Sequence, residues 1–396
     1  DAPMERVEYS MREGGSMLSP INDLVPADVQ AAVVEAHDRI MSGELVVEFN
    51  PAPIEDIVAA SDEPCIRVAA LFVRDIHDGG WNETHGNGAT YLQEQLPCAE
   101  VLFLTDTPDD QTSEAVMHDL ANDGYDLIFA TSFGYIEFMS RVAPDHPDVV
   151  FEHATGYLTD TNFSNYSGSL FQATYLAGIA AGSMTENNKI GYVGPFTTPD
   201  VLRDFNGLVL GAREVNPDIE FQMIWVNSWF DPAVETQAAQ TLLDWGADVL
   251  FYGTSGGAVG QAADAAGAYW VAGNGLARSF APDSFLTAPN YNWGVYYVMA
   301  AEAVMDGTWD SEPYWGTMAD GFIVLSDLGP AVPADVADLI ATRAEEMVNG
   351  TFEVFAGPIV SQDGTVQVPA GESGYTNGHL FGMDYVLEGV EGSMPN

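Results

Sequence analysis

Short apolar runs recur along this chain, and stretches of helical character lie between them. We expect helices at 81–95, 113–122, 200–215 and 233–245. Strands that alternate with helices of this length predict parallel sheets built from βαβ units. The runs that we interpret as buried strands are VAALFV (68–73), AEVLFL (99–104), DLIFA (126–130), DVVFE (148–152), KIGYVG (189–194), EFQMIWV (220–226), ADVLFY (247–252) and AYWVAG (268–273).

The number of predicted strands indicates two lobes. One sheet of ordinary size would not hold them all, and a single hydrophobic core stops growing at about 250–300 residues. The break between lobes is expected near 155–166, where the segment TGYLTDTNFSNYSG is rich in turn-forming residues. The fold class is therefore α/β, with two doubly wound lobes that each contain a parallel sheet.

The charge balance is strongly acidic. Fifty-nine acidic residues face eleven basic ones, a formal net charge of −48, and Lys189 is the only lysine. A hydrophobic content of 47% is high enough to build a core, which excludes a disordered acidic tail. The chain offers no basic patch to offset phosphates, so nucleic acid is excluded as a partner.

Self-repulsion of this size destabilises a compact fold in dilute buffer. At molar salt the Debye length falls to about 3 Å, and most of that repulsion vanishes. We therefore expect a protein that works in a high-salt environment; the alternative is an ordinary acidic secreted protein.

The termini and short motifs are consistent with an extracellular location. No apolar run reaches the roughly 18–20 residues that a membrane helix needs, and Asp1 is expected to follow a processed leader. Asn-X-Ser/Thr motifs make asparagine glycosylation a candidate modification. The motifs begin at Asn82, Asn162, Asn165 and Asn349.

The two cysteines precede two neighbouring strands. Cys65 lies before the strand expected at 66–73, Cys98 lies before the strand at 101–104, and the helix at 81–95 separates them. A right-handed crossover would make these strands parallel neighbours, about 4.8 Å apart. That spacing lies within the Cα range of a disulfide, and an extracellular setting would let it form. The alternative is a pair of small buried thiols.

Open α/β sheets bind ligands beyond the carboxyl ends of their strands. In the first lobe these ends lead into 75–82 and 131–134. In the second lobe they lead into 227–231, 253–257 and 273–275. We therefore expect the ligand site among these five loops.

Several motifs resemble the basic membrane protein (BMP) family, in the order in which that family carries them. The motifs are RVAALFVRDIHDGGWNETHGNGA (67–89), GYDLIFATSFGYIEFM (124–139), YLAGIAAGSMTENNKIGYVG (175–194), WVNSWFDP (225–232) and TAPNYNWGVYY (287–297). The resemblance covers roughly residues 65–360 and implies a two-lobed, type I periplasmic-binding-like clamp. Members are substrate-binding proteins of ABC importers whose ligands are purine nucleosides or free purine bases. It also implies that the chain returns to the first lobe around 288–293.

The resemblance implies that a purine stacks between Trp81 of one lobe and Trp229 of the other. Alternatively, Trp81 packs on its own sheet, and Trp225 or Phe230 takes the place of Trp229. Asp78 could equally cap a helix. The remaining candidate ligand-binding residues are Asp78, Asn82, Ser132, Phe133, Asn227, Asp231, Ser255 and Asn274.

This chain departs from the family at two points. Nucleoside-binding relatives carry acidic residues where this chain has Asn274, which favours a free base over a nucleoside. The lipid-anchoring cysteine common in the family is missing from the N-terminus, so any attachment to the cell surface would need another device.

Enzyme functions find little support. Gly253–Gly257 fits the G-x-S-x-G pattern of a hydrolase, but His379 is the only histidine after Ser255. His77 and His85 lack the ligand spacing of a zinc site. We therefore expect no catalytic residue, no metal and no cofactor.

An internal repeat suggests a second function. Residues 11–43 align without gaps to 318–350, with identities that include Val-Pro-Ala-Asp-Val at 25–29 and 332–336. One explanation is that the repeat is a remnant of a tandem gene fusion. The alternative is a structural subunit whose N-terminal segment docks on a neighbouring copy and builds a head-to-tail filament. The docking face would contain Val29, Val33, Val34 and Ile40.

The leading hypothesis is an extracellular purine-binding protein that delivers its ligand to an ABC permease. Its expected parts are an N-terminal extension (1–62), a first lobe (63–160 and 289–330), a second lobe (161–288) and a C-terminal segment with a tail (331–396).

Overall fold

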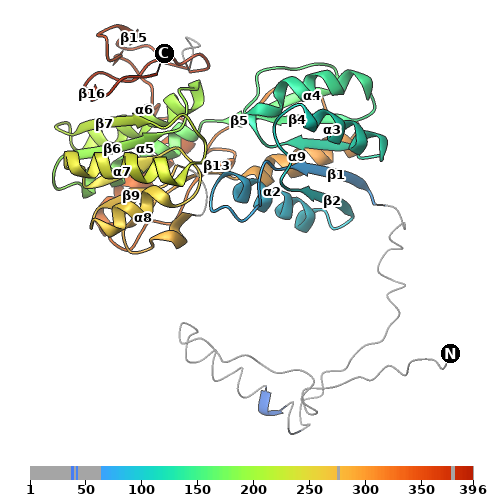
Figure 1. Cartoon of the computed structure of the whole chain (residues 1–396), viewed down its shortest axis with the longest axis horizontal. Helices are drawn as coiled ribbons and strands as arrows, with labels where there is room; N and C mark the ends of the chain where they lie inside the picture. The colour runs from blue at the N-terminus through green and yellow to red at the C-terminus, as the bar shows by residue number, and fades with distance from the viewer. Residues whose placement is uncertain (1–36, 40–41, 43–63, 274–276, 376–379, 396) are drawn as a thin grey trace. The chain divides into compact units, whose positions relative to one another are not determined.

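The computed structural model describes residues 37–39, 42, 64–273, 277–375 and 380–395 (Figure 1). The chain divides into two units, residues 1–60 and residues 61–396. In the first unit, residues 37–39 and 42 are helical. The proposed docking residues Val29, Val33, Val34 and Ile40 lie outside the described residues, so the assembly hypothesis stays a prediction.

The first lobe contains a six-stranded sheet in the order β12-β5-β4-β3-β1-β2, and all its neighbouring strands are parallel. Its strands are β1 (Ile66–Leu71), β2 (Ala99–Leu104), β3 (Leu127–Ala130), β4 (Val150–Ala154), β5 (Phe163–Gly168) and β12 (Tyr314–Gly316). Its helices are α2 (Trp81–Gln95), α3 (Thr112–Asn122), η3 (Phe133–Tyr135), α4 (Ile136–Val142), η4 (Ala143–Asp145) and α9 (Trp293–Asp306).

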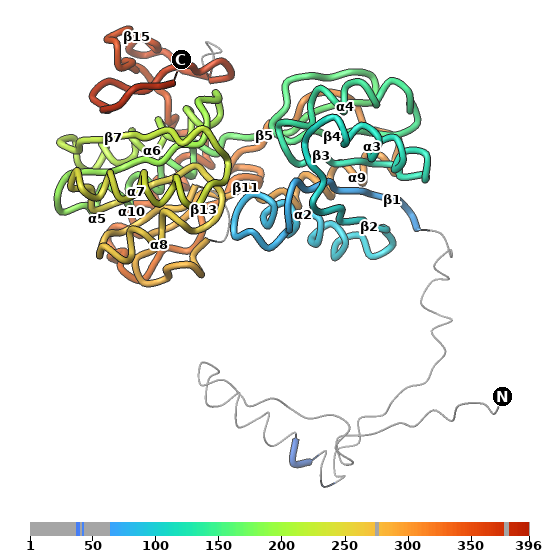
Figure 2. The backbone as a smooth tube through the Cα atoms, viewed as in Figure 1, coloured from blue at the N-terminus to red at the C-terminus, as the bar shows by residue number. Residues whose placement is uncertain are grey.

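Both faces of this sheet are buried. Val68 and Ala70 of β1 pack in a cluster with α2 and α9, whereas Ala69 and Leu71 pack in a cluster with α3 and α4. A strand buried on both faces reads as a continuous apolar run, which is why β1 was recognisable from the sequence. Figure 2 shows α9, which is distant in sequence, returning to the part of the first lobe that contains α2 and β1.

The second lobe contains another parallel six-stranded sheet, in the order β10-β9-β8-β6-β7-β16. Its strands are β6 (Lys189–Gly194), β7 (Glu220–Trp225), β8 (Val249–Tyr252), β9 (Tyr269–Val271), β10 (Phe285–Thr287) and β16 (Val390–Glu391). Its helices are α5 (Leu170–Met184), α6 (Pro199–Val215), α7 (Pro232–Trp245), α8 (Ala258–Ala265), η5 (Ala277–Phe280) and α10 (Ala334–Val348). Two smaller antiparallel pairs are β11 (Pro289–Tyr291) with β13 (Ile323–Leu325) and β14 (Ile359–Val360) with β15 (Val366–Val368).

The first crossing between lobes corrects a predicted boundary. The segment at 155–166 was expected to separate the lobes at residue 160, but β5 pairs with β4 and β12 in the first sheet, so the crossing follows Gly168. Every residue of β5 is buried although its sequence, FSNYSG, is largely polar. Tertiary hydrogen bonds satisfy polar groups of this strand: Ser164 Oγ donates to Ser311 O at 3.1 Å, and Asn165 Nδ2 donates to Leu158 O at 3.0 Å.

The C-terminal segment is part of the second lobe rather than a separate piece. Helix α10 packs on α5, and β16 adds a parallel strand beside β7. Arg203 ties the tail to α6, since its Nη1 donates to Leu380 O at 2.5 Å. The second copy of the repeat, 318–350, therefore contributes α10 to this lobe and β13 to the antiparallel pair with β11.

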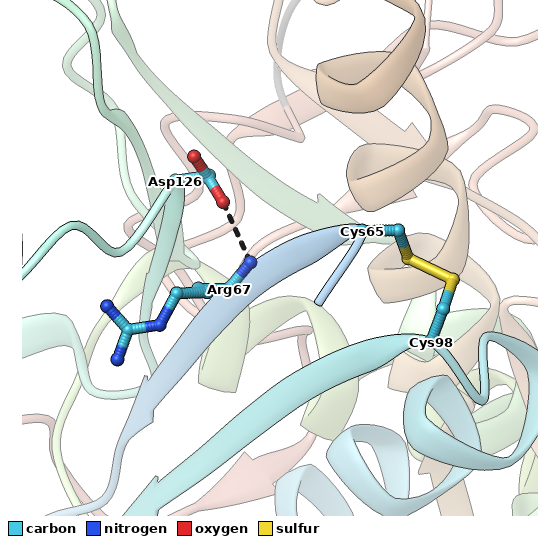
Figure 3. Close-up of a disulfide and its surroundings, with 4 residues drawn as sticks. All are labelled: Cys65, Arg67, Cys98 and Asp126. Atoms are coloured by element: carbon cyan, nitrogen blue, oxygen red, sulfur yellow. Dashed lines mark hydrogen bonds between the residues drawn. A yellow bond between two sulfur atoms is a disulfide. The ribbon is translucent and has the colours of Figure 1, made fainter. Parts of the chain in front are cut away.

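The predicted disulfide is confirmed. Cys65 and Cys98 are bonded with their Cα atoms 5.4 Å apart, and Cys65 N donates to Cys98 O at 3.1 Å. Strands β1 and β2 are parallel neighbours, as the position of the cysteines required (Figure 3). On the other side of β1, Arg67 N donates to the Asp126 carboxylate at 2.8 Å. Within the described part of the chain, no helix combines the length and the apolar character that crossing a membrane requires.

Candidate functional site

A cavity of about 360 Å³ lies between the two lobes. Its walls come mainly from loops at the carboxyl ends of the parallel strands, where ligands of open α/β sheets bind. Eight of the ten predicted ligand-binding residues line it: Asp78, Trp81, Asn82, Ser132, Phe133, Asn227, Trp229 and Ser255. Asp231 does not line it, and Asn274 lies outside the described residues.

Loops of the two lobes approach one another at this cavity. Gly79 has φ +68°, and a Cβ at Gly80 would lie 3.2 Å from the backbone nitrogen of Gly256 in the other lobe. The turn before α2 therefore needs glycine for both its conformation and its close approach. Arg74 bridges the lobes as well, because its guanidinium carbon lies 4.4 Å from the ring centre of Phe230.

Trp81 opens α2 and is half-buried on the wall of the first lobe. Its indole Nε1 donates to Thr131 O, and its ring meets Trp293 edge-on with centroids 5.4 Å apart. Tyr291 makes a second edge contact at 6.1 Å. Trp81 thus packs on its own lobe and also borders the cavity, so the two sequence-based alternatives are compatible.

Trp229 lies on the opposite wall, in the loop between β7 and α7, and is 42% exposed. Its carbonyl accepts from Ser255 N at 2.8 Å, and its ring lies 5.2 Å from that of Phe196. Of the two competing aromatic residues, Phe230 also lines the cavity, whereas Trp225 is not among the lining residues and packs edge-on against Tyr192. Trp229 is thus the lining tryptophan of the second lobe.

Asp78 and Asn82 lie together at the start of α2. The Asp78 carboxylate accepts from Gly80 N at 2.9 Å, from Glu83 N at 3.1 Å and from Asn82 Nδ2 at 2.7 Å. Asp78 therefore braces the start of α2, but the N-cap residue is Gly80, so Asp78 is not the N-cap that the alternative proposed. Asn82 is 5% exposed, and its Oδ1 has no hydrogen-bond partner among the described residues. Because Asn82 lines the cavity, this acceptor is a candidate for a ligand contact.

Ser132 and Phe133 follow β3 on the same wall. Ser132 Oγ donates to Asp109 at 2.7 Å, and Ser132 O accepts from His153 Nε2 at 2.8 Å. These bonds fix the loop backbone while Phe133 stays 41% exposed beside the cavity. Phe133 thus offers a second flat apolar face on the first lobe.

Asp231 has a structural role instead of the predicted ligand contact. Its side chain caps α7 by accepting from Val234 N at 3.1 Å, and its own N–H donates to Glu235 at 2.7 Å. Glu235 is fully buried and also accepts from Thr254 Oγ1 at 2.9 Å. Burial raises the pKa of Glu235. The carboxyl of Glu235 therefore joins the loop that carries Trp229 to the loop that carries Ser255.

The second lobe also contributes polar side chains through β6 and α6 that were not among the predicted ligand-binding residues. Tyr192, Asp200 and Asp204 all line the cavity. The segment 195–200 follows the carboxyl end of β6, so the same strand-end rule would have pointed to it. Burial raises the pKa of Asp204, and neighbouring Arg203 acts in the opposite direction.

The comparisons with known proteins agree with this architecture. The profile of the Bmp family, described as ABC transporter substrate-binding protein PnrA-like, matches residues 65–354. The chain belongs to the Bmp family. It is thus a substrate-binding protein of an ABC transporter, with two parallel sheets and a periplasmic-binding-protein-like fold.

Two relatives of this Bmp protein share the same level of identity. A Haloferax volcanii protein described as an ABC transporter glucose-binding protein is 36% identical over 337 residues, which cover 85% of this chain and 83% of that protein. A purine-binding protein of Brucella abortus is 36% identical over 340 residues, covering 85% and 96%. The solved ABC transporter solute-binding protein of Conexibacter woesei superposes with a TM-score of 0.63 at 26% identity, over 73% of this chain and 98% of that one.

The described histidines do not contribute to the cavity that Ser255 lines. Among the described residues, none of the side chains that line the cavity is a histidine, and His379 lies outside those residues. His85 is fully buried, stacks on Trp293 at 4.1 Å and shares a 2.6 Å hydrogen bond with Tyr297. No group of three potential metal-ligating side chains occurs in the described part of the chain.

Burial argues against three of the four candidate glycosylation sites. Asn82, Asn162 and Asn165 are each 5–6% exposed, and their side-chain nitrogens donate to protein oxygens. A glycan on any of them would break these hydrogen bonds and has no room in the fold. Asn349 is exposed at the end of α10 and stays a candidate.

Proposed function

We propose that this Bmp-family protein captures a purine, as a free base or a nucleoside, between its two lobes. It would work outside the cell and deliver the ligand to an ABC permease. Closure over the ligand would then shift the balance between open and closed forms toward the shape that the permease recognises.

The observation that carries the proposal is the pair of tryptophans on opposite walls of one cavity. Trp81 lines it from the first lobe and Trp229 from the second, with Phe133 and Phe230 as further aromatic faces. A purine presents two flat faces, and stacking of a base on an aromatic side chain contributes about 1–3 kcal/mol. A binder that takes one face from each lobe would couple ligand capture to closure.

Polar groups at the edge of the cavity support the same ligand class. The unpartnered Oδ1 of buried Asn82 can accept from a ring or exocyclic N–H of a purine. Ser132, Asn227 and Ser255 add groups that can both donate and accept. A few placed polar groups on a largely apolar wall are the usual arrangement for orienting a small ligand.

The relatives leave two ligand classes to compare, because one is described as purine-binding and one as glucose-binding at the same 36% identity. The aromatic faces from both lobes favour the purine. The Cys65–Cys98 disulfide supports an extracellular setting, since disulfides persist in oxidising environments. The excess of acidic residues supports a high-salt one.

Isothermal titration calorimetry of the full chain in molar KCl tests this function. Adenine, guanine, hypoxanthine, adenosine and inosine are titrated in turn, with glucose as the competing class. We expect saturable binding of at least one purine and weaker or no binding of glucose. Binding of glucose without any purine would refute the purine ligand and leave the transport class intact.

A further inference from the structure

A polar patch on the second lobe has no role in the stacking scheme. Asp200 and Asp204 lie four residues apart on α6, so their side chains share one face of the helix, and both line the cavity. Within the described part of the chain, no hydrogen bond to either carboxylate is found. Two acceptor groups therefore face the cavity from α6, a helix that the sequence pattern does not place at the site.

Tyr192 provides an independent observation at the same place. It is 1% exposed, and its ring is held between Phe205, at 4.3 Å, and Phe251, at 5.2 Å. Its hydroxyl lies over Gly253 of the cavity wall, where an added Cβ would approach it to 2.7 Å. No hydrogen-bond partner of this hydroxyl is found among the described residues. A buried, rigidly held phenol thus faces the cavity with its hydrogen-bonding capacity unused.

We propose that Asp200, Asp204 and Tyr192 form a hydroxyl-binding subsite that takes the vicinal hydroxyl groups of a sugar. Carboxyl oxygens accept hydrogen bonds, and sugar hydroxyls donate them. The phenol of Tyr192 can donate to a hydroxyl or ring oxygen of the same sugar.

This inference rests on the proposed function and deepens it. A purine stacked between Trp81 and Trp229 that also carries a sugar is a nucleoside, and the subsite supplies what the ribose needs. Asn274, in place of an acidic residue, favoured a free base; carboxylates of α6 can take over that task from another element. The same chemistry would also fit a free hexose.

The decisive experiment compares adenosine, adenine and glucose by calorimetry in molar KCl, for the wild-type chain and for Asp204→Asn. The variant keeps the size of the side chain and replaces one carboxyl oxygen with an amide nitrogen, which cannot accept a hydrogen bond. It should fold, because burial already disfavours the charged form of Asp204. Tyr192→Phe removes the hydroxyl and keeps the ring stack, and Asp218→Asn makes the same substitution at an exposed position.

We expect the wild-type protein to bind adenosine more tightly than adenine. Asp204→Asn should weaken adenosine binding by roughly tenfold or more, Tyr192→Phe by less, and Asp218→Asn should not change it. Equal adenosine affinity in the wild-type protein, Asp204→Asn and Tyr192→Phe would overturn the subsite.

The remaining outcomes separate the subsite from the purine proposal. If adenine binds while adenosine and glucose do not, the subsite is wrong and the purine ligand stands. If glucose alone binds and Asp204→Asn weakens it, the subsite stands with a free sugar as its source, and the purine ligand is wrong. If none of the three probes binds, and guanine, hypoxanthine and inosine do not bind either, both proposals are overturned.

Discussion

Trp229 is the residue that reports most directly on ligand stacking, because it is 42% exposed and its ring contacts Phe196 rather than a core. We expect Trp229→Ala to weaken binding of the preferred purine about 10- to 100-fold, from loss of about 1–3 kcal/mol of stacking. Trp229→Phe keeps a flat face and should retain most of the affinity. Calorimetry measures both, and an unchanged affinity in Trp229→Ala would remove Trp229 from the site.

Trp81 is less suited to this measurement. Its ring packs against Tyr291 and Trp293, and its indole nitrogen holds the loop after β3. Truncation would therefore perturb the lobe as well as the ligand contact. A loss of affinity in Trp81→Ala is therefore informative only if the melting temperature of the variant shows that the first lobe stays folded.

Glu152 on β4 is a buried acid whose titration should be visible in the stability of the protein. Its Oε1 accepts from Trp309 Nε1 at 2.8 Å, and its Oε2 has no partner among the described residues. Burial raises the pKa of Glu152 to about 7. The folded state thus holds a proton that the unfolded state releases at lower pH, so stability falls as the pH rises from the ordinary glutamate range through about 7.

We therefore expect Glu152→Gln to stabilise the protein at pH 8, by at most about 3 kcal/mol, and to change little near pH 4. Denaturant unfolding in molar KCl at both pH values is the measurement, with exposed Glu94→Gln as the control. Burial lowers the pKa of neighbouring His153 to about 4, which makes stability fall on acidification in both proteins. The difference between variant and wild type isolates Glu152, and a difference independent of pH would contradict its titration.

At the scale of elements, the disulfide joins the starts of β1 and β2 across the α2 crossover. The two cysteines are 33 residues apart, and closing a loop of this length restricts the unfolded chain by about 3–4 kcal/mol in the entropic model. The double variant Cys65→Ser, Cys98→Ser should unfold at a lower temperature. The reduced wild-type protein should melt like the variant, and equal melting of oxidised and variant proteins would show that the bond adds no stability.

Strand β5 shows why elements were not equally predictable. The run at 68–73 was recognised because β1 is apolar on both faces. In β5, the polar residues Ser164, Asn165 and Ser167 resemble a loop, although the strand is fully buried. Their burial depends on partners far away in the sequence, such as Ser311 O for Ser164. A local pattern therefore predicts a turn where the tertiary structure places a strand.

At the scale of the whole molecule, charge should control stability. The chain has 59 acidic and 11 basic residues, and several of the described cations are already engaged, as in the pairs Arg67–Glu100 and Arg141–Glu114. We expect the melting temperature to rise substantially between about 0.1 M and about 3 M KCl. Over this range the Debye length falls from about 10 Å to about 3 Å or less, and the repulsion between the acidic residues weakens. NaCl at equal molarity should act similarly. A melting temperature that does not change with salt would contradict the high-salt expectation.

The sequence by itself determined the two parallel sheets, most strand and helix positions, the disulfide and eight of the residues that line the cavity. These follow from apolar periodicity and from the rule that loops after parallel strands meet at one edge. Only the tertiary structure decided that Asp231 caps α7 and that Asp200, Asp204 and Tyr192 face the ligand space. The physical reason is that the role of a polar side chain depends on which distant groups bury it or leave it without a partner, and a local pattern carries no information about those groups.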